Sequence, residues 1–254
     1  MLIGPQTRIE TFLVGDRFNT PGTAGSFLAA TGINPTSIYQ CQESSGSAID
    51  SVSGNNLDVI GSPKFRAAFG GKTGFKYDVA GAGHGSDVND FASNSVLFGC
   101  IATNPATPSV GLPGLIGRTC FTTFPSAMIY RASDSVKYAT FTIRDSVSTL
   151  VLSDNSINVV DNPRPVLYVG QIDRTNNTAR FLVAHTSKVL TQQSGSIAGF
   201  GTLTGGFAPM FCFGAGTKMV AGPAVLYGFY ATGAQCEGST KPLSVAKGLG
   251  FGGL

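Results

Sequence analysis

The chain has little charge, no tryptophan and only two histidines among its 254 residues. Lys, Arg, Asp and Glu make up 12% of it, about half of the roughly 25% found in ordinary soluble domains. The 17 basic and 14 acidic residues are scattered singly, whereas a nucleic-acid backbone is bound by concentrated positive charge. This argues against nucleic acid as a partner. The 42% of hydrophobic residues is enough for a sizeable core.

Long apolar segments are also missing. No run of about 18 apolar residues lacks a polar interruption, so we expect no membrane-spanning helix and no membrane insertion. Pro5, Arg8 and Glu10 interrupt the place where the apolar region of a secretory signal would lie. We therefore expect synthesis in a cytoplasm without a signal peptide.

The five cysteines have no metal-site or redox spacing. They are Cys41, Cys100, Cys120, Cys212 and Cys236, and no two of them form a C-x-x-C motif. Free cysteine is among the most buried residue types, so we expect buried thiols on strands. At most two disulfides could form, because the number of cysteines is odd.

Strand signals are frequent and helix signals are scarce. The strand candidates are β-branched or aromatic segments that end in turn residues. They are Ser95–Ala102, Ala127–Arg131, Tyr138–Arg144, Thr149–Leu152, Val166–Ile172, Ala179–Ala184, Pro209–Phe213 and Ala224–Tyr230. Strands that recur this often predict an all-β fold, a two-sheet antiparallel β-sandwich.

The two ends of the chain differ from the middle. Residues 1–30 hold one strand candidate, Thr7–Val14, followed by a Gly- and Pro-rich stretch that suggests an arm. Residues 31–235 are predicted to form the sandwich, and residues 236–254 a Gly-rich, flexible tail. Because the tail's large apolar side chains would be unfavourable in water, we expect Phe251 and Leu254 to contact a partner surface.

Several segments together carry a family resemblance: an opening strand with acidic turns, a hairpin and a closing strand pair. They are Tyr39–Gly46, Ala48–Asn56, Gly61–Pro63, Val166–Ile172 with Ala179–Ala184, and Met210–Ala215 with Val225–Gly233. This order resembles the laminin-G-like branch of the concanavalin A-like jelly rolls. Tyr39 stands where members of that family often carry a tryptophan. The resemblance implies the same jelly-roll sandwich over residues 36–235.

Some enzymes on this fold hydrolyse polysaccharides with two closely spaced carboxylates, one acting as acid and the other as nucleophile. The chain has three glutamates, Glu10, Glu43 and Glu237, and no Glu-x-Asp-x-Glu arrangement. We therefore expect no catalytic residues and no enzyme activity.

One segment gathers potential ligands for an ion. His84, Asp87, Asn89 and Asp90 lie within eight residues, and Ca²⁺ prefers oxygen ligands such as Asp and Asn. The same residues are ordinary turn formers, and a solvated loop explains them more simply. If the chain holds a calcium site, we expect it at Asp87, Asn89 and Asp90, with His84 contacting a ligand or partner. No other cofactor is indicated.

These features favour a non-enzymatic structural or adhesive virion protein, most simply from a tailed bacteriophage. It would decorate a capsid or form part of a tail or fibre. We expect its partners to be other virion proteins, copies of itself and a host-surface glycan. The alternatives are a carbohydrate-binding lectin module of a cell-surface protein and, less favoured, a glycoside hydrolase or lyase on the same fold.

Overall fold

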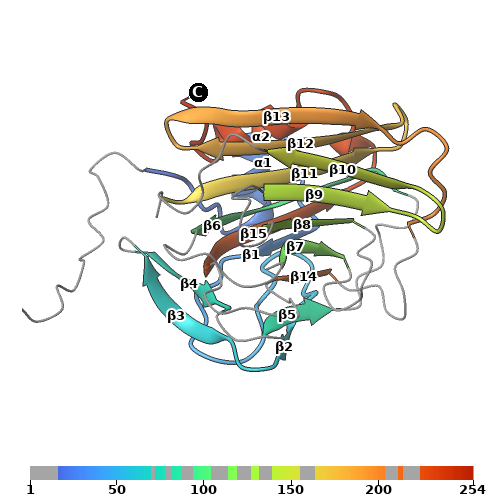
Figure 1. Cartoon of the computed structure of the whole chain (residues 1–254). Helices are drawn as coiled ribbons and strands as arrows, with labels where there is room; N and C mark the ends of the chain where they lie inside the picture. The colour runs from blue at the N-terminus through green and yellow to red at the C-terminus, as the bar shows by residue number, and fades with distance from the viewer. Residues whose placement is uncertain are drawn as a thin grey trace, which may run out of the picture.

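Figure 1 shows a computed structural model of the chain as two β-sheets packed face to face, with helices on one outer face. The structure describes residues 17–69, 72–77, 82–86, 94–103, 114–118, 127–131, 139–154, 164–203, 211–213 and 224–253. The predicted strand at Thr7–Val14 lies outside these residues. The predicted two-sheet antiparallel β-sandwich is confirmed.

Within the described residues, the larger sheet has eight strands and is antiparallel throughout. Its order is β13 (Lys188–Ser196), β12 (Thr178–His185), β11 (Val166–Asp173), β6 (Val96–Thr103), β15 (Ala224–Thr232), β4 (Lys72–Lys76) and β3 (Lys64–Phe69), with β1 (Ser37–Tyr39) also paired to β15.

The smaller sheet has seven strands in the same described ranges. Its order is β10 (Thr149–Asp154), β9 (Ala139–Arg144), β8 (Ala127–Arg131), β7 (Gly114–Arg118), β14 (Phe211–Phe213), β5 (Gly83–Ser86) and β2 (Asp58–Ile60). The eight strand candidates named from the sequence all form strands, with ends within two residues of those expected. The predicted closing strands, β14 and β15, lie in different sheets instead of pairing with each other.

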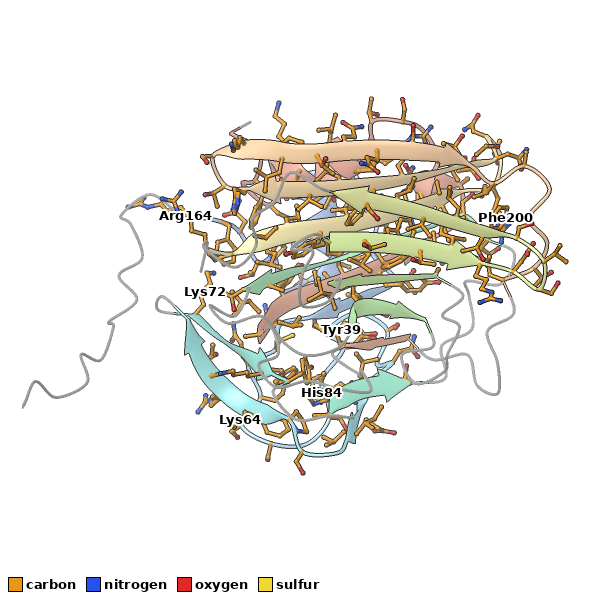
Figure 2. The ribbon with its side chains drawn as sticks, viewed as in Figure 1. Tyr39, Lys64, Lys72, His84, Arg164 and Phe200 are labelled. Carbon is orange, nitrogen blue, oxygen red and sulfur yellow. The ribbon has the colours of Figure 1, made fainter. Side chains whose placement is uncertain are left out.

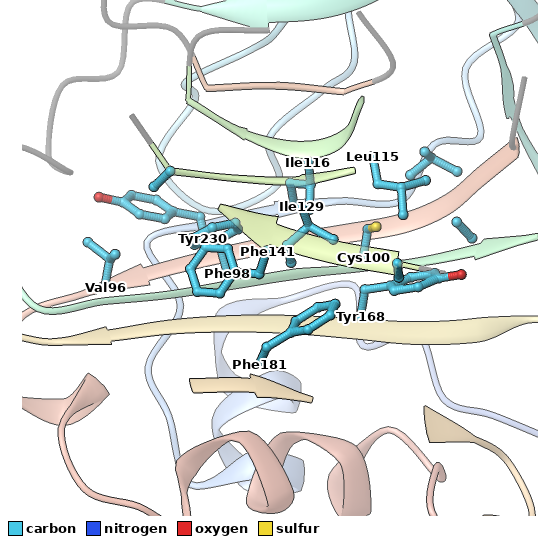
Figure 3. Close-up of a cluster of buried hydrophobic side chains, with 14 of the residues drawn as sticks. Val96, Phe98, Cys100, Leu115, Ile116, Ile129, Phe141, Tyr168, Phe181 and Tyr230 are labelled. Atoms are coloured by element: carbon cyan, nitrogen blue, oxygen red, sulfur yellow. The ribbon is translucent and has the colours of Figure 1, made fainter. Parts of the chain in front are cut away.

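A hydrophobic core fills the space between the sheets, as Figure 3 shows. The ring of Phe141 from the smaller sheet meets Phe98 edge-on at 5.7 Å between centroids and lies 6.0 Å from Phe181. Gly170 leaves room for this contact, because a Cβ there would press on the rings of Phe98 and Phe141. The alternating inward residues of both sheets thus interlock as expected for a sandwich.

A second core lies on the outer face of the larger sheet, beneath α1 (Ala24–Thr31) and α2 (Lys241–Gly248). Thr23 caps α1 through a reciprocal bond with Ser26, and Phe27 packs on Phe229 at 5.2 Å between ring centroids. Because both faces of the sheet are covered, β6 and β11 are buried along their whole length.

The helices correct two expectations about the chain ends. The segment expected to be an arm holds α1 up to its last residue, and the segment expected to be a flexible tail contains α2, which follows the 3₁₀ turn η1 (Ala234–Cys236). Both helices place apolar side chains on the sheet, so their stability comes from tertiary packing. None of the described helices is long and apolar enough to cross a membrane.

Three cysteines have described side chains, and all are buried free thiols: Cys41, Cys100 and Cys236. Cys100 lies on β6, as expected for a buried strand thiol. Burial raises the pKa of all three thiols, so they remain protonated at neutral pH and serve as apolar packing groups.

Candidate functional site

The structure leaves the predicted calcium loop undecided. Asp87, Asn89, Asp90 and Leu254 lie outside the described residues. In the ranges that are described, no group of three or more His, Cys, Asp or Glu side chains is placed to hold a metal ion. The calcium site at these residues stays a prediction.

His84, on β5, lies inside the protein among aromatic side chains (Figure 2). Its ring stacks on Phe75, with 4.4 Å between centroids, and meets Phe65 edge-on at 5.7 Å. Nδ1 lies 2.8 Å from the Tyr77 hydroxyl, and Nε2 lies 3.2 Å from the carbonyl oxygen of Gly46. Because a carbonyl can only accept, Nε2 carries the proton and Nδ1 accepts from Tyr77.

This environment corrects the expectation that His84 contacts a ligand or partner. Burial lowers the pKa of His84 to about 4, although the bond to the Gly46 carbonyl acts in the opposite direction. The imidazole is therefore neutral at pH 7, and both of its nitrogens are already engaged within the chain. His84 is a core residue that joins β5 to the loop after β1.

Phe251 also packs within its own chain, which corrects its predicted role as a partner contact. The side chain is fully buried, and its ring lies 5.5 Å from that of Phe18. The next two residues are fixed by their backbone: Gly252 donates to the carbonyl of His185 at 2.7 Å, and Gly253 to that of Thr186 at 2.9 Å. The unfavourable hydration expected for this side chain is removed by the N-terminal segment and α2.

Three turns meet at one end of the sandwich, and we call this surface the loop end: residues 145–148, 173–178 and 197–201. The β9–β10 turn is joined to the segment after β13 where Gly201 donates its N–H to Asp145 Oδ2 at 2.7 Å. The β11–β12 turn is joined to the same segment where Ile197 donates to the carbonyl of Asn177 at 2.9 Å. Direct bonds thus hold three turns from distant parts of the chain together.

Carboxylates fix the turns of the loop end. Asp145 accepts backbone N–H groups from Val147, Ser148 and Gly201, and these bonds lower the pKa of its carboxyl group. Asp173 is fully buried. Burial alone would raise its pKa, but donors from Gly238, Asn176 and Arg180 outweigh burial and lower it. Both carboxylates are thus ionised and structural.

The loop end presents an aromatic ring, an aliphatic side chain and a guanidinium group. In the described part of the chain all tyrosine side chains are buried, and Phe65 and Phe200 are the partly buried phenylalanines. The ring of Phe65 is engaged with His84 and Phe75. Phe200 packs in part against the core and lies at the end of the molecule (Figure 2). Val147 is 91% exposed.

Arg174 completes this surface. Its backbone N–H donates to Ser95 Oγ at 3.0 Å, which fixes the turn that carries it. Partial burial lowers the pKa of the guanidinium, and the nearby Asp145 carboxylate acts in the opposite direction. An arginine is charged at any physiological pH. The turns of the loop end therefore carry both a positive, planar donor and an aromatic side chain, and sugars are bound by groups of these two kinds.

The sequence did not single out Asp145, Arg174 or Phe200. The turn at 173–178 contains Asp and Asn residues of the kind that form turns, but nothing in the order of residues indicates which turns meet. Asp145 had one local signal, since it directly follows a strand and precedes Ser and Val, as an acceptor of turn N–H groups does.

No family model matches the chain, and no curated protein matches its sequence. Solved structures share its fold over 83% of its length. The binding domain of Paraclostridial Mosquitocidal Protein 1 gives a TM-score of 0.56 at 7% identity, and the botulinum neurotoxin serotype C1 binding domain gives 0.54 at 12% identity. A Trypanosoma rangeli sialidase in complex with sialic acid gives 0.55 at 11% identity.

The chain is shorter than these structurally similar proteins. It covers 51% of each toxin chain and 32% of the sialidase chain. At identities of 7–12% the likeness establishes the β-sandwich fold, and function has to be argued from the residues.

Proposed function

We propose that the chain is a non-enzymatic recognition module, a lectin-like β-sandwich that binds a glycan at its loop end. The observation that carries the proposal is that Phe200 and Arg174 lie on two of the three turns joined at the loop end, where Asp145 accepts from Gly201 and Asn177 accepts from Ile197. Phe200 provides a face for the C–H groups of a sugar ring, and Arg174 donates hydrogen bonds to its substituents. A guanidinium favours sugars that carry a carboxylate.

The fold comparisons support this proposal. Two of the similar structures are binding domains of toxins, and the third is a sialidase solved with sialic acid. The absence of enzyme activity is supported by the state of the carboxylates. Asp50, Asp145 and Asp173 are each occupied by backbone donors, so none of the three is placed as a general acid or nucleophile.

A glycan array followed by titration calorimetry tests the proposal. We expect the protein to bind acidic glycans, and Phe200→Ala and Arg174→Gln each to weaken binding about tenfold or more. Phe65→Ala and Arg66→Gln are matched controls, since they remove the same chemistry away from the loop end and should leave affinity unchanged. An array without hits removes the lectin function, and release of free sugar would identify an enzyme.

The module is proposed to act on a virion, as a capsid decoration or as a tail or fibre component. The low charge of the chain supports broad contacts with other proteins, because few ions need to be desolvated when a surface is covered. Mass spectrometry of purified particles tests this part. The chain should be present in a fixed ratio to the major capsid protein, and particles without it would contradict a virion role while leaving glycan binding standing.

A further inference from the structure

Ser95, the residue before β6, joins two segments that are far from it along the chain. The residue is buried, with 5% of its surface exposed. Its hydroxyl oxygen accepts the backbone N–H of Arg174 at 3.0 Å, and the hydroxyl donates to Glu237 Oε1 at 2.9 Å. These partners are 79 and 142 residues away in sequence. Hydrogen bonds therefore run without a break from the loop end to the residue that follows η1.

The chemistry of the three groups fixes the direction of both bonds. A backbone N–H can only donate, a carboxylate accepts, and a hydroxyl has a single proton. The Ser95 proton is therefore directed at Glu237, which leaves a lone pair of the oxygen for Arg174. A bond to a carboxylate is stronger than one between neutral groups, and hydrogen bonds in series strengthen one another. Glu237 thus strengthens the bond by which Ser95 holds the backbone of Arg174.

The backbone on either side of Glu237 is itself fixed to the larger sheet. On β11, Gln171 Nε2 donates to the carbonyl of Cys236 at 2.5 Å and to that of Gly238 at 2.9 Å. Asp173 Oδ2 accepts the N–H of Gly238 at 2.9 Å. Gln171 and Asp173 are both fully buried. The carboxylate that faces Ser95 therefore has a fixed support, which a group that orients a binding residue requires.

Ser95 does not need its hydroxyl to keep its own place. Its backbone carbonyl accepts from the N–H of Gly233 at 2.9 Å and from Thr232 Oγ1 at 3.4 Å, which ties it to the end of β15. The hydroxyl instead fixes Arg174, whose carbonyl also accepts from the N–H of Asn177 at 3.4 Å. Because both of its backbone groups are bonded, Arg174 presents its side chain from a fixed position, which lowers the entropy lost on binding.

We propose that Ser95 and Glu237 are positioning residues of the glycan site. They hold the backbone of Arg174, so that its guanidinium meets the carboxylate of an acidic sugar without first ordering the turn. Ser95 acts through Arg174 and does not touch the sugar. This inference rests on the proposed function, because Arg174 is the group that donates to the sugar there.

NMR titration of the full chain with sialic acid and with its methyl ester tests the proposal, because esterification removes the charge of the carboxyl group. Ser95→Ala should weaken binding of sialic acid about threefold to tenfold, as expected for one lost hydrogen bond, and leave binding of the ester unchanged. Glu237→Gln keeps an acceptor without its charge, so its effect should be smaller. Ser47→Ala is the matched control, since Ser47 also donates to a carboxylate, Asp58 Oδ1 at 3.1 Å. Asp58 lies on β2, at the edge of the smaller sheet opposite to β10.

A double-mutant cycle separates positioning from a general loss of structure. In the Arg174→Gln background, Ser95→Ala should cause no further loss of sialic acid binding, because the hydroxyl acts through the guanidinium. An equal further loss in that background overturns the proposal. So does wild-type affinity in Ser95→Ala when Arg174→Gln binds more weakly, and the proposed function then still stands. If the wild type does not bind sialic acid, or Arg174→Gln binds it equally tightly, the proposed role of Arg174 is contradicted and this inference fails with it.

Discussion

The amide N–H of Gly201 donates to Oδ2 of Asp145 across 2.7 Å, and this bond joins two turns that are 56 residues apart. The same carboxylate accepts from Val147 at 2.8 Å and from Ser148 at 2.5 Å. One side chain thus fixes both the exposed turn and the segment that carries Phe200. The loop end is ordered before any ligand arrives, which lowers the entropic cost of binding.

Removing this carboxylate should loosen the loop end locally. In Asp145→Ala we expect the amides of Val147, Ser148 and Gly201 to exchange with solvent about tenfold faster, because each loses its acceptor. Hydrogen exchange measured by NMR or mass spectrometry checks this. Asp58→Ala is the control, as Asp58 is exposed and accepts one bond from Ser47. If the protection of these amides were unchanged in Asp145→Ala, the turns would keep their structure without the Asp145 carboxylate.

The buried His84 predicts a loss of stability in mild acid. Its pKa in the folded protein is about 4, whereas it is about 6.5 in an unfolded chain. The unfolded state therefore takes up a proton first as the pH falls. The contribution of His84 is complete above pH 6.5 and decreases as the pH drops towards 4, by about 3 kcal/mol in total.

Urea unfolding at several pH values between 7 and 4 measures this loss. In His84→Gln the stability should depend less on pH over this window, because the titrating group is absent. Tyr77→Phe is the matched variant: it removes the hydroxyl that donates to Nδ1 but keeps the imidazole, so the pH dependence should remain. Parallel pH profiles for wild type and His84→Gln would show that His84 is not the group responsible.

The sequence predicted eight of the fifteen described strands, because these eight are rich in β-branched and aromatic residues that face a core. The opening motif of the family resemblance also has a physical basis. Asp50 accepts from the backbone N–H groups of Ile38 and Val52 through Oδ1, and from Ser53 and Asn55 through Oδ2. A single acidic residue with small and amide neighbours therefore closes this loop.

What the sequence could not predict depends on contacts between distant segments. β13 was missed because its polar Thr-Gln-Gln-Ser-Gly-Ser segment lacks an apolar alternation, as suits an edge strand that contributes little to the core. The helices α1 and α2 were missed because eight residues that include Gly or Pro give no clear helical period. That the turns of Phe200 and Arg174 meet is a property of the fold alone.

Two glycines provide opposite tests of the packing. Gly99 lies at the centre of the larger sheet, where a Cβ would overlap the Tyr168 carbonyl oxygen and the ring of Phe229. Gly99→Ala should destabilise the protein by about 3 kcal/mol, because neither neighbour is free to move. Gly25→Ala should stabilise it by about 0.5–1 kcal/mol, since Gly25 lies in α1 with nothing within 4 Å of the added methyl group. Denaturant unfolding measures the free energy of unfolding of both variants. An equal change in the two would contradict the packing described for β6.

Truncation of Phe251 tests whether the end of the chain packs on its own fold or on a partner protein. Its ring is fully buried in the second core, where it lies 5.5 Å from the ring of Phe18. Phe251→Ala should therefore cost the isolated protein about 3 kcal/mol, in line with other buried aromatic truncations. It should also expose the amides of Gly252 and Gly253 to exchange. Leu28→Ala is the control, because Leu28 is 45% exposed on α1 and its truncation should cost much less.

The two possible outcomes assign the end of the chain differently. If Phe251→Ala left stability and exchange unchanged while abolishing association with another protein, the tail would be a docking element. A large loss of stability in the isolated protein instead assigns Phe251 to the second core of its own chain.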